Sequence, residues 1–377
     1  MGSLSPPQPF QPPPRDFPTN FRIFLSFGSR KPSPNTNMSN WIEGYNPSNN
    51  AWHYITRIPG LIENQVLKGF SMISMGNSIF IIGGRLCHKM VGINDVEDPN
   101  EIVEVDLEVI STVLRYDVRD DAWFKCAPMH TPRFDFACTV CDNKIYVAGG
   151  QCTLASARGI SLAEVYDPVQ NLWIALPNMS TSRYKCVGVR WKGKVHVVGG
   201  FTGNGNSWDT MERSSAEVYD SECAKWGHKL GMWQLDVPPN QIVVGPGGKL
   251  FSSGDCLNAW KGQIEAYDED VNIWKGVEGS HYQALSYPTF STEADSSPLF
   301  RRLFLTMAPI GTHFYFLAGY RMPGDISGMM SVVHVFDTST NVREGWRSFE
   351  PVEEDQEKEL CSHCCAFEGD HEDNMLS

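Results

Sequence analysis

The sequence predicts an all-β protein made of about six repeated units, each a four-stranded antiparallel sheet. Three observations carry this prediction. An aromatic residue followed by Asp or Asn recurs along the 377 residues, with a Trp a short distance after it. An apolar run that ends in two small residues recurs upstream of each later copy. The 33 glycines, 24 prolines and 11 tryptophans are spread along most of the chain, a mixture that favours short strands and turns over helices.

The aromatic pair marks the third and fourth strands of each unit. Apolar and polar residues alternate up to Tyr166, for example, and the Asp that follows favours a turn before a returning strand with the Trp. One large ring per unit at one strand position favours a structural role between neighbouring sheets over a sugar-binding platform. The pairs are Tyr45 and Trp52, Tyr116 and Trp123, Tyr166 and Trp173, Tyr219 and Trp226, Tyr267 and Trp274, and Phe336 and Trp346.

A glycine pair marks the end of the second strand. Paired glycines are typical where a chain leaves a buried strand with positive φ or where a neighbouring backbone comes close. A further strand precedes each pair, such as Phe136 to Val140, and completes the unit. Units of about 50 residues with four strands have the period of a propeller blade. The copies are Gly83-Gly84, Gly149-Gly150 and Gly199-Gly200, with weaker ones at Gly254-Asp255 and Ala318-Gly319.

These motifs resemble the kelch repeat family, whose blades have a glycine pair after the second strand, Tyr-Asp at the end of the third and Trp in the fourth. The resemblance covers residues 20–368 and is most specific in the middle three units. It implies a six-bladed kelch β-propeller. Asp255 in place of a second glycine and the longer turn before Trp346 depart from the family pattern.

The two ends of the chain are predicted to meet in one blade. Residues 21–28 have the pattern of a second strand, and residues 360–367 that of a first strand. Pairing them closes the ring and removes unpaired edges that would invite aggregation. The expected organisation is a disordered Pro-rich segment over 1–20, a propeller over 21–368 and an acidic flexible tail over 369–377.

Charge and composition exclude several partners. The net charge of −13 and the absence of a Lys/Arg cluster argue against nucleic acid and against an acidic membrane surface. No apolar run approaches the ~20 residues that cross a bilayer. Eleven cysteines, an odd number, without a recognisable export signal are typical of reduced thiols in the cytoplasm or nucleus.

No catalytic or metal-binding pattern stands out in the sequence. Cys138 and Cys141 are three apart on one predicted strand, so they face opposite sides of a regular sheet. The histidines are scattered among different units. We therefore expect no enzyme activity, no cofactor and no metal. Two alternatives stay open: a zinc or redox role for the C-terminal group Cys361, His363, Cys364, Cys365 and His371, and a metal-dependent or sugar-acting enzyme on a kelch-like propeller.

Partner binding is predicted on one loop face. Loops after the second and after the fourth strands emerge on the same side, and loops on a rigid scaffold commonly carry function. Arg and aromatic residues there are typical interface anchors, although an Arg at such a position could instead brace neighbouring loops. An acidic insertion, residues 94–108, lies on this face too and either favours a basic partner or is a solvated loop. The expected contacts are Arg85, Arg133, Gln151, Arg183, Phe201, Tyr320 and Arg321, with Ser29 and Cys256 also at the channel mouth.

The expected function is therefore that of a monomeric module that binds one or more proteins. Kelch propellers like those of the plant F-box/kelch group serve as substrate receptors of ubiquitin ligases when an F-box or BTB domain precedes them. Residues 1–20 are too short and too Pro-rich for an F-box, so such a role is expected to need a second chain or a longer gene product.

Overall fold

The computed structural model describes residues 21–30, 39–91, 102–202, 213–235, 237–255, 264–280, 301–321, 329–339, 345–354 and 357–369. These ranges are built of antiparallel β-sheets, together with the short 3-10 turn η1 (Pro246–Gly248). The all-β prediction is confirmed, and the many four-stranded antiparallel sheets fit a kelch propeller.

Six sheets of four or more strands lie within the described ranges. From the innermost strand outward, the first sheet is β30 (Lys358–Glu368), β1 (Phe21–Ser29), β2 (Trp41–Asn46) and β3 (Ala51–Arg57), and the second is β5 (Ser71–Met75), β6 (Ser78–Ile82), β9 (Val113–Asp117) and β10 (Ala122–Cys126). In the same order, the third sheet is β11 (Ala137–Cys141), β12 (Lys144–Ala148), β13 (Ala163–Asp167) and β14 (Leu172–Leu176), and the fourth is β16 (Val187–Trp191), β17 (Lys194–Val198), β19 (Ala216–Asp220) and β20 (Lys225–Lys229). The fifth sheet is β21 (Ile242–Val244), β22 (Leu250–Ser252), β23 (Glu265–Asp268) and β24 (Ile273–Gly276), and the sixth is β25 (Arg301–Ile310), β26 (His313–Arg321), β27 (Met329–Asp337) and β28 (Trp346–Ser348), with β29 (Val352–Glu354) also paired to β27.

Two smaller sheets lie beside these six. One pairs β15 (Arg183–Tyr184) with β18 (Phe201–Thr202). The other is three-stranded, in the order β4 (Gln65–Lys68), β7 (Arg85–Val91) and β8 (Ile102–Val109).

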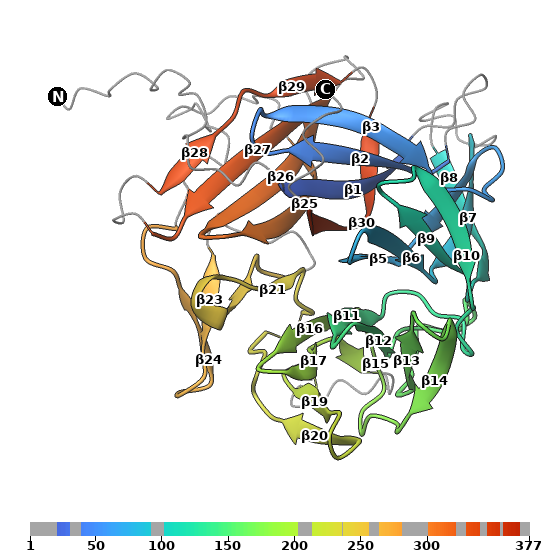
Figure 1. Ribbon diagram of the computed structural model, residues 1–377, viewed down its shortest axis with the longest axis vertical. Coiled ribbons are helices and arrows are strands. Elements are labelled where there is room, and N and C mark those ends of the chain that lie inside the picture. Colours follow the sequence, from blue (N-terminus) through green and yellow to red (C-terminus); the bar gives the residue numbers. More distant parts are fainter. Residues whose placement is uncertain are drawn as a thin grey trace, which may run out of the picture.

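The six sheets are arranged around a common centre (Figure 1). The innermost strands β30, β5, β11, β16, β21 and β25 contact one another in that order, and β25 contacts β30 in turn. The contact order is therefore cyclic. The buried apolar clusters lie between adjacent sheets, so the core is a set of interfaces between neighbouring sheets.

Strands from the two ends of the chain pair in one sheet. β1 runs antiparallel to β30, from Phe21 opposite Glu368 to Ser29 opposite Lys358. The register shifts around Ser26, where β30 has extra residues. The strand predictions at 21–28 and 360–367 are thus confirmed, with slightly longer bounds.

The repeated aromatic pairs pack as neighbours on paired strands. In all six sheets the two ring centroids of the pair are 5.0–5.3 Å apart. Four indole Nε1 groups also donate to the preceding sheet or the loop after it, as Trp173 does to the carbonyl of Ala127 at 2.9 Å. Each such pair therefore holds one sheet together and ties it to the sheet before.

The turn between third and fourth strands is fixed by side chains. The Tyr166 hydroxyl donates to Oδ1 of Asn171 at 2.8 Å, and Asn171 has φ 50°. The Asp167 carboxylate accepts from the backbone N–H of Val169 and of Gln170. Asn tolerates positive φ better than most residues, which explains why this position follows the Tyr at a fixed distance.

The glycine pairs sit where two backbones approach closely. Gly149 and Gly150 have φ 69° and 91°. A Cβ on Gly149 would lie 2.6 Å from the carbonyl oxygen of Arg183, which no side chain could tolerate without movement. The pairs Gly83-Gly84 and Gly199-Gly200 have the same conformations.

Two details differ from the sequence prediction. Ala318 and Gly319 do not end a strand, because β26 continues through Arg321 in register with β25 and β27. The acidic insertion is not simply a solvated loop, since its residues 102–108 belong to β8. Residues 1–20, 94–101, 281–300 and 370–377, with Cys256 and His371, lie outside the described residues.

Candidate protein-binding face

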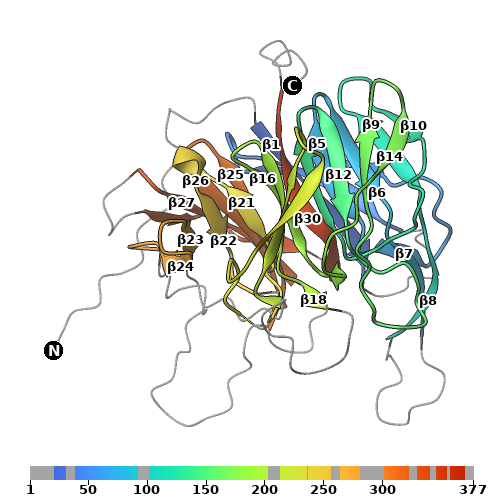
Figure 2. The same cartoon turned by 90° about the horizontal axis from the view of Figure 1, so that it is seen from below.

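One face of the molecule is formed where second strands end and first strands begin. The N–H of Gly84 donates to the carbonyl of Arg133, and that of Gly150 to the carbonyl of Arg183, both at 2.8 Å. Each loop after a second strand is thereby tied to the entry of the next sheet. We call this side the loop face. It is the lower side of Figure 2, where β7, β8 and β18 lie.

Arg133 and Arg183 are internal braces. Both side chains are fully buried. Arg133 donates to the carbonyls of Gly149 at 2.9 Å and Leu162 at 3.0 Å, and to the carboxylate of Glu164 at 2.6 Å. The predicted partner contact is wrong for these two residues, because a guanidinium with no exposed surface cannot reach a partner. The alternative, bracing of neighbouring loops, describes their contacts.

Arg183 repeats this arrangement one sheet later. It donates to the carbonyls of Gly199 at 2.8 Å and Ser215 at 3.2 Å, and one of its nitrogens lies 3.6 Å from Glu217. Burial lowers the pKa of Arg133, and the neighbouring carboxylate of Glu164 opposes that shift. These two repeats therefore bury an Arg with a Glu as its counter-charge.

The two acidic partners, Glu164 and Glu217, were missed in the sequence. Glu217 accepts from the backbone N–H groups of Ser180 and Thr181, both at 2.8 Å. Glu164 likewise accepts from the backbone N–H groups of His130 and Thr131. A signal was present: β13 and β19 have the same sequence, Ala-Glu-Val-Tyr-Asp, so the Glu occupies one repeat position. An acidic residue on a buried strand requires a nearby cation.

Gln151 and Tyr320 are also poor candidates for partner contact. Gln151 is 6% exposed and Tyr320 is 3% exposed. The backbone of Gln151 pairs with Phe134, and Tyr320 packs in the apolar cluster between the fifth and sixth sheets. Ser29 is buried as well, and its carbonyl accepts from Lys89.

Three predicted contacts remain partly accessible on the loop face: Arg85, Phe201 and Arg321. Arg85 lies over the ring of Phe134 at 5.2 Å and pairs with Asp106 at 3.1 Å. The Arg321 side chain is 41% exposed and donates to Glu357 at 2.8 Å.

Phe201 forms the aromatic part of this surface. Its ring packs on Tyr184 with centroids 5.4 Å apart, and the guanidinium of Arg213 lies 5.9 Å from its centroid. The loop face thus presents half-buried guanidinium and aromatic groups held in position by their neighbours. Such preorganised side chains are suited to binding a protein surface.

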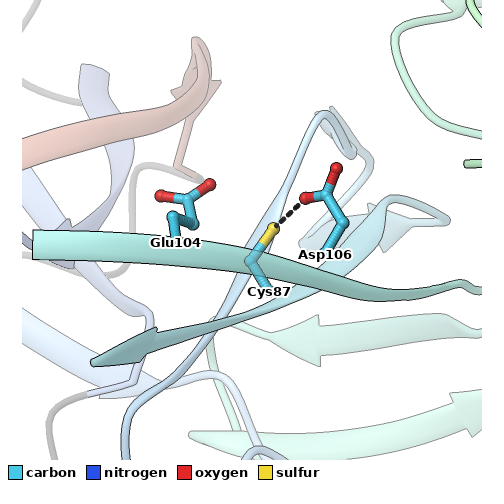
Figure 3. Close-up of side chains that lie close together, drawn as sticks. All are labelled: Cys87, Glu104 and Asp106. Carbon is cyan, nitrogen blue, oxygen red and sulfur yellow. Dashed lines mark hydrogen bonds between the residues drawn. The ribbon is translucent and has the colours of Figure 1, made fainter. Parts of the chain in front are cut away.

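A three-stranded sheet, β4-β7-β8, stands on the same face and contains one cluster of potential metal ligands. Cys87, Glu104 and Asp106 have ligand atoms within 4.8 Å of one another, and Figure 3 shows the thiol directed at Asp106. The Cys87 sulfur lies 3.1 Å from Asp106 Oδ1, and burial together with this hydrogen bond raises the pKa of the thiol.

The carboxylates of that cluster already have cationic partners. Asp106 pairs with Arg85, and Glu104 with Lys68. Burial alone would raise the pKa of Glu104, but the hydrogen bond and charge of Lys68 bring it below its ordinary value. A protonated thiol between compensated carboxylates is a hydrogen-bonded group and a poor ligand set for a cation, because metal binding needs the thiolate.

The C-terminal cysteine group is divided between two sheet interfaces. Cys361 and Cys365 pack in the cluster between the first and second sheets, and Cys364 packs against the sixth. Burial raises the pKa of all three thiols, that of Cys364 to about 12. Buried thiols that face different interfaces are suited to packing, and this arrangement does not favour the zinc or redox alternative.

Three histidines with lowered pKa values are also separated from one another. Burial lowers the pKa of His196 to about 4, of His334 to about 3 and of His363 to about 4. They lie on strands of three different sheets.

A cavity between β11 and β16 has a volume of ≈ 10 Å³, room for about one water molecule.

Comparison with known proteins identifies the repeat. A family profile described as Kelch motif matches residues 132–180. An F-box/kelch-repeat protein of Arabidopsis thaliana is 32% identical over 193 residues, 51% of this chain and 46% of that protein. The F-box/kelch-repeat protein SKIP30 of Arabidopsis thaliana is 24% identical over 82% of this chain and 74% of its own length. Kelch-like protein 28 of Homo sapiens is 30% identical over 25% of this chain and 17% of its own.

The matches cover only part of several relatives. The chain spans 46% and 48% of the length of two of the Arabidopsis thaliana proteins that it matches. Within the described residues there is no helix with the length and apolar character of a membrane span.

Proposed function

Because this chain belongs to the kelch repeat family, we propose that it is a closed six-bladed propeller that binds a partner protein on its loop face and carries out no chemistry itself. The cyclic contacts of the innermost strands and the pairing of β1 with β30 support closure. The observation that supports protein binding is the division of roles on the loop face. Buried Arg–Glu pairs fix the loops, while Arg85, Phe201 and Arg321 stay partly accessible.

The relatives of this chain also point to a class of cellular process. Several relatives are named F-box/kelch-repeat proteins. We propose that the chain acts in the cytoplasm or nucleus as a substrate-recognition component linked to ubiquitin-dependent degradation, as a monomeric propeller. The partner is then a protein whose abundance falls when this chain is present.

Affinity capture from a plant cell extract tests the binding face. Wild-type protein is compared with Phe201→Ala combined with Arg321→Ala. The control, Val169→Ser combined with Val271→Ser, alters exposed turns on the opposite face. We expect the loop-face variant to lose a captured protein by at least about tenfold and the control to retain it. Equal capture by all three would contradict the proposed face.

The degradation link has a separate readout. The captured protein should decrease in abundance when the full chain is expressed and recover when the proteasome is inhibited. If the partner binds but its abundance does not change, the chain is still a protein-binding module, and its proposed role in degradation is overturned.

A further inference from the structure

We propose that the open edge of β8 binds an extended, basic segment of a partner as an added strand of the β4-β7-β8 sheet. This inference rests on the proposed function and names the class of partner. Figures 1 and 2 show β7 and β8 at the periphery of the ring, beside the second sheet. Among the residues that the structure describes, β8 pairs with β7 along one side and has no strand on the other.

The backbone of β8 offers hydrogen-bonding groups at this edge. Lys89 donates its N–H toward β4, to the carbonyl of Asn64. Successive residues of a strand point their backbone groups to opposite sides, so His88 and Met90 direct theirs toward β8. Their opposite residues, Val105 and Val103, therefore pair with β7, and the N–H and C=O of Glu104 between them point to the open edge.

The residues of β8 are accessible on both faces of the strand, although the side chains of Glu104 and Asp106 are partly buried. All six residues from Val103 to Glu108 are classed as exposed. Val103 and Val105 are 41% exposed, and Met90, opposite Val103, is 42% exposed on the same side. A row of accessible aliphatic groups beside backbone groups that no other described residue pairs with is the surface that strand addition uses.

The sheet is held firmly in place, which lowers the entropic cost of binding to its edge. The Nζ of Lys89, 5% exposed, donates to the carbonyl of Ser29 at 2.6 Å and pairs with Glu359. Lys68 pairs with both Glu104 and Glu359. These contacts attach the sheet to the ends of β1 and β30.

The charges of β8 select a basic occupant. The strand alternates aliphatic residues with Glu104, Asp106 and Glu108 and has no basic residue. Lys68 and Arg85 compensate two of these three carboxylates, so the strand keeps a negative balance. An added strand places its side chains directly opposite, where opposite charges attract and like charges repel. A segment that alternates aliphatic residues with Lys or Arg therefore fits both faces, and the protein's net charge of −13 favours its approach.

A second copy of this chain is a poorer occupant. Antiparallel pairing of β8 with itself sets Glu104 opposite Asp106 in one class of register. In the other class it sets valines opposite carboxylates. Both arrangements are unfavourable, so the edge discriminates against self-association while remaining open to a basic strand.

Peptide binding measured by fluorescence anisotropy tests the inference. The probe is a labelled peptide of alternating valine and lysine, as long as β8. The controls are the matching valine–glutamate peptide and the valine–lysine peptide N-methylated along its centre, which cannot donate from either edge. We expect the wild-type protein to bind the first peptide at least about tenfold more tightly than either control.

Two variants locate the site on the protein. Glu104→Pro removes the outward N–H, whereas Glu104→Gln retains it and removes the same charge. We expect Glu104→Pro to bind at least about tenfold more weakly than wild type, and Glu104→Gln at most about threefold more weakly. Since proline could disturb β8, the N-methylated peptide on the wild-type protein gives the same test without altering the fold.

The outcomes separate this inference from the proposed function. Equal binding of the methylated and unmethylated peptides, or no binding of the valine–lysine peptide, overturns the β8 site. In that case a loss of partner by the Phe201 and Arg321 variant still upholds the loop face. Peptide binding that survives in that variant and fails in Glu104→Pro supports the β8 edge as a separate contact.

Discussion

Removal of one member of a buried Arg–Glu pair gives the most informative stability prediction. Glu217→Ala leaves the Arg183 guanidinium without its counter-charge and removes the acceptor of the Ser180 and Thr181 N–H groups. Both charged residues are fully buried, so water cannot replace the lost partner. Breaking such a pair costs about 3–5 kcal/mol. We expect the free energy of unfolding to fall by that amount.

The assay is urea unfolding followed by tryptophan fluorescence. The variants are compared on the condition that the slope of unfolding free energy against urea concentration is the same for all of them. Lys194→Met is the matched control, since the Lys194–Asp220 pair at 2.6 Å is partly exposed, with side-chain exposures of 49% and 27%. Exposed pairs contribute about 0–1 kcal/mol. The control should therefore unfold close to wild type.

Arg183 itself supplies the refuting experiment. We expect Arg183→Ala to destabilise the protein as Glu217→Ala does, because the remaining carboxylate is then buried without its counter-charge. If Arg183→Ala unfolds within about 0.5 kcal/mol of wild type and also loses a bound partner, the bracing role is refuted. Direct contact of Arg183 with the partner would then be the better explanation.

Two further predictions concern the repeat core. Trp173→Ala should cost about 3–5 kcal/mol of unfolding free energy and Tyr166→Phe about 1 kcal/mol, because the first leaves a cavity and the second removes one hydrogen bond; urea unfolding distinguishes them, and equal losses would contradict this division. Burial lowers the pKa of His196 from 6.5 to about 4, so the unfolded chain takes up a proton first as the pH falls. Stability should decline between pH 6.5 and 4, and His196→Phe should flatten part of that decline; identical pH profiles would show that His196 does not contribute.

The sequence was sufficient to predict the repeating architecture because its signals are local and periodic. The Tyr–Trp spacing reflects one hairpin with an Asx turn, and the glycine pairs reflect positive φ at a close backbone approach. The pairing of 21–28 with 360–367 could also be predicted, because the repeats leave one unit incomplete at each end.

The site was harder to predict because burial depends on contacts across sheets. Arg133 has the composition of an interface anchor, and only the carbonyls of Gly149 and Leu162 and the carboxylate of Glu164 show that it faces inward. The strand β8 looked like an acidic loop since its alternation of Val and Glu lacks a buried face. Its pairing with β7 is what makes it a sheet edge.

Cross-linking of the captured complex through lysine side chains tests the central claim most directly. Lys185 is exposed on the loop face, between β15 and β16, while Lys192 and Lys194 are exposed at the opposite end of β16 and β17. If the loop face binds the partner, mass spectrometry should find partner cross-links at Lys185 and few or none at the other two. Cross-links concentrated at Lys192 and Lys194 would contradict the account.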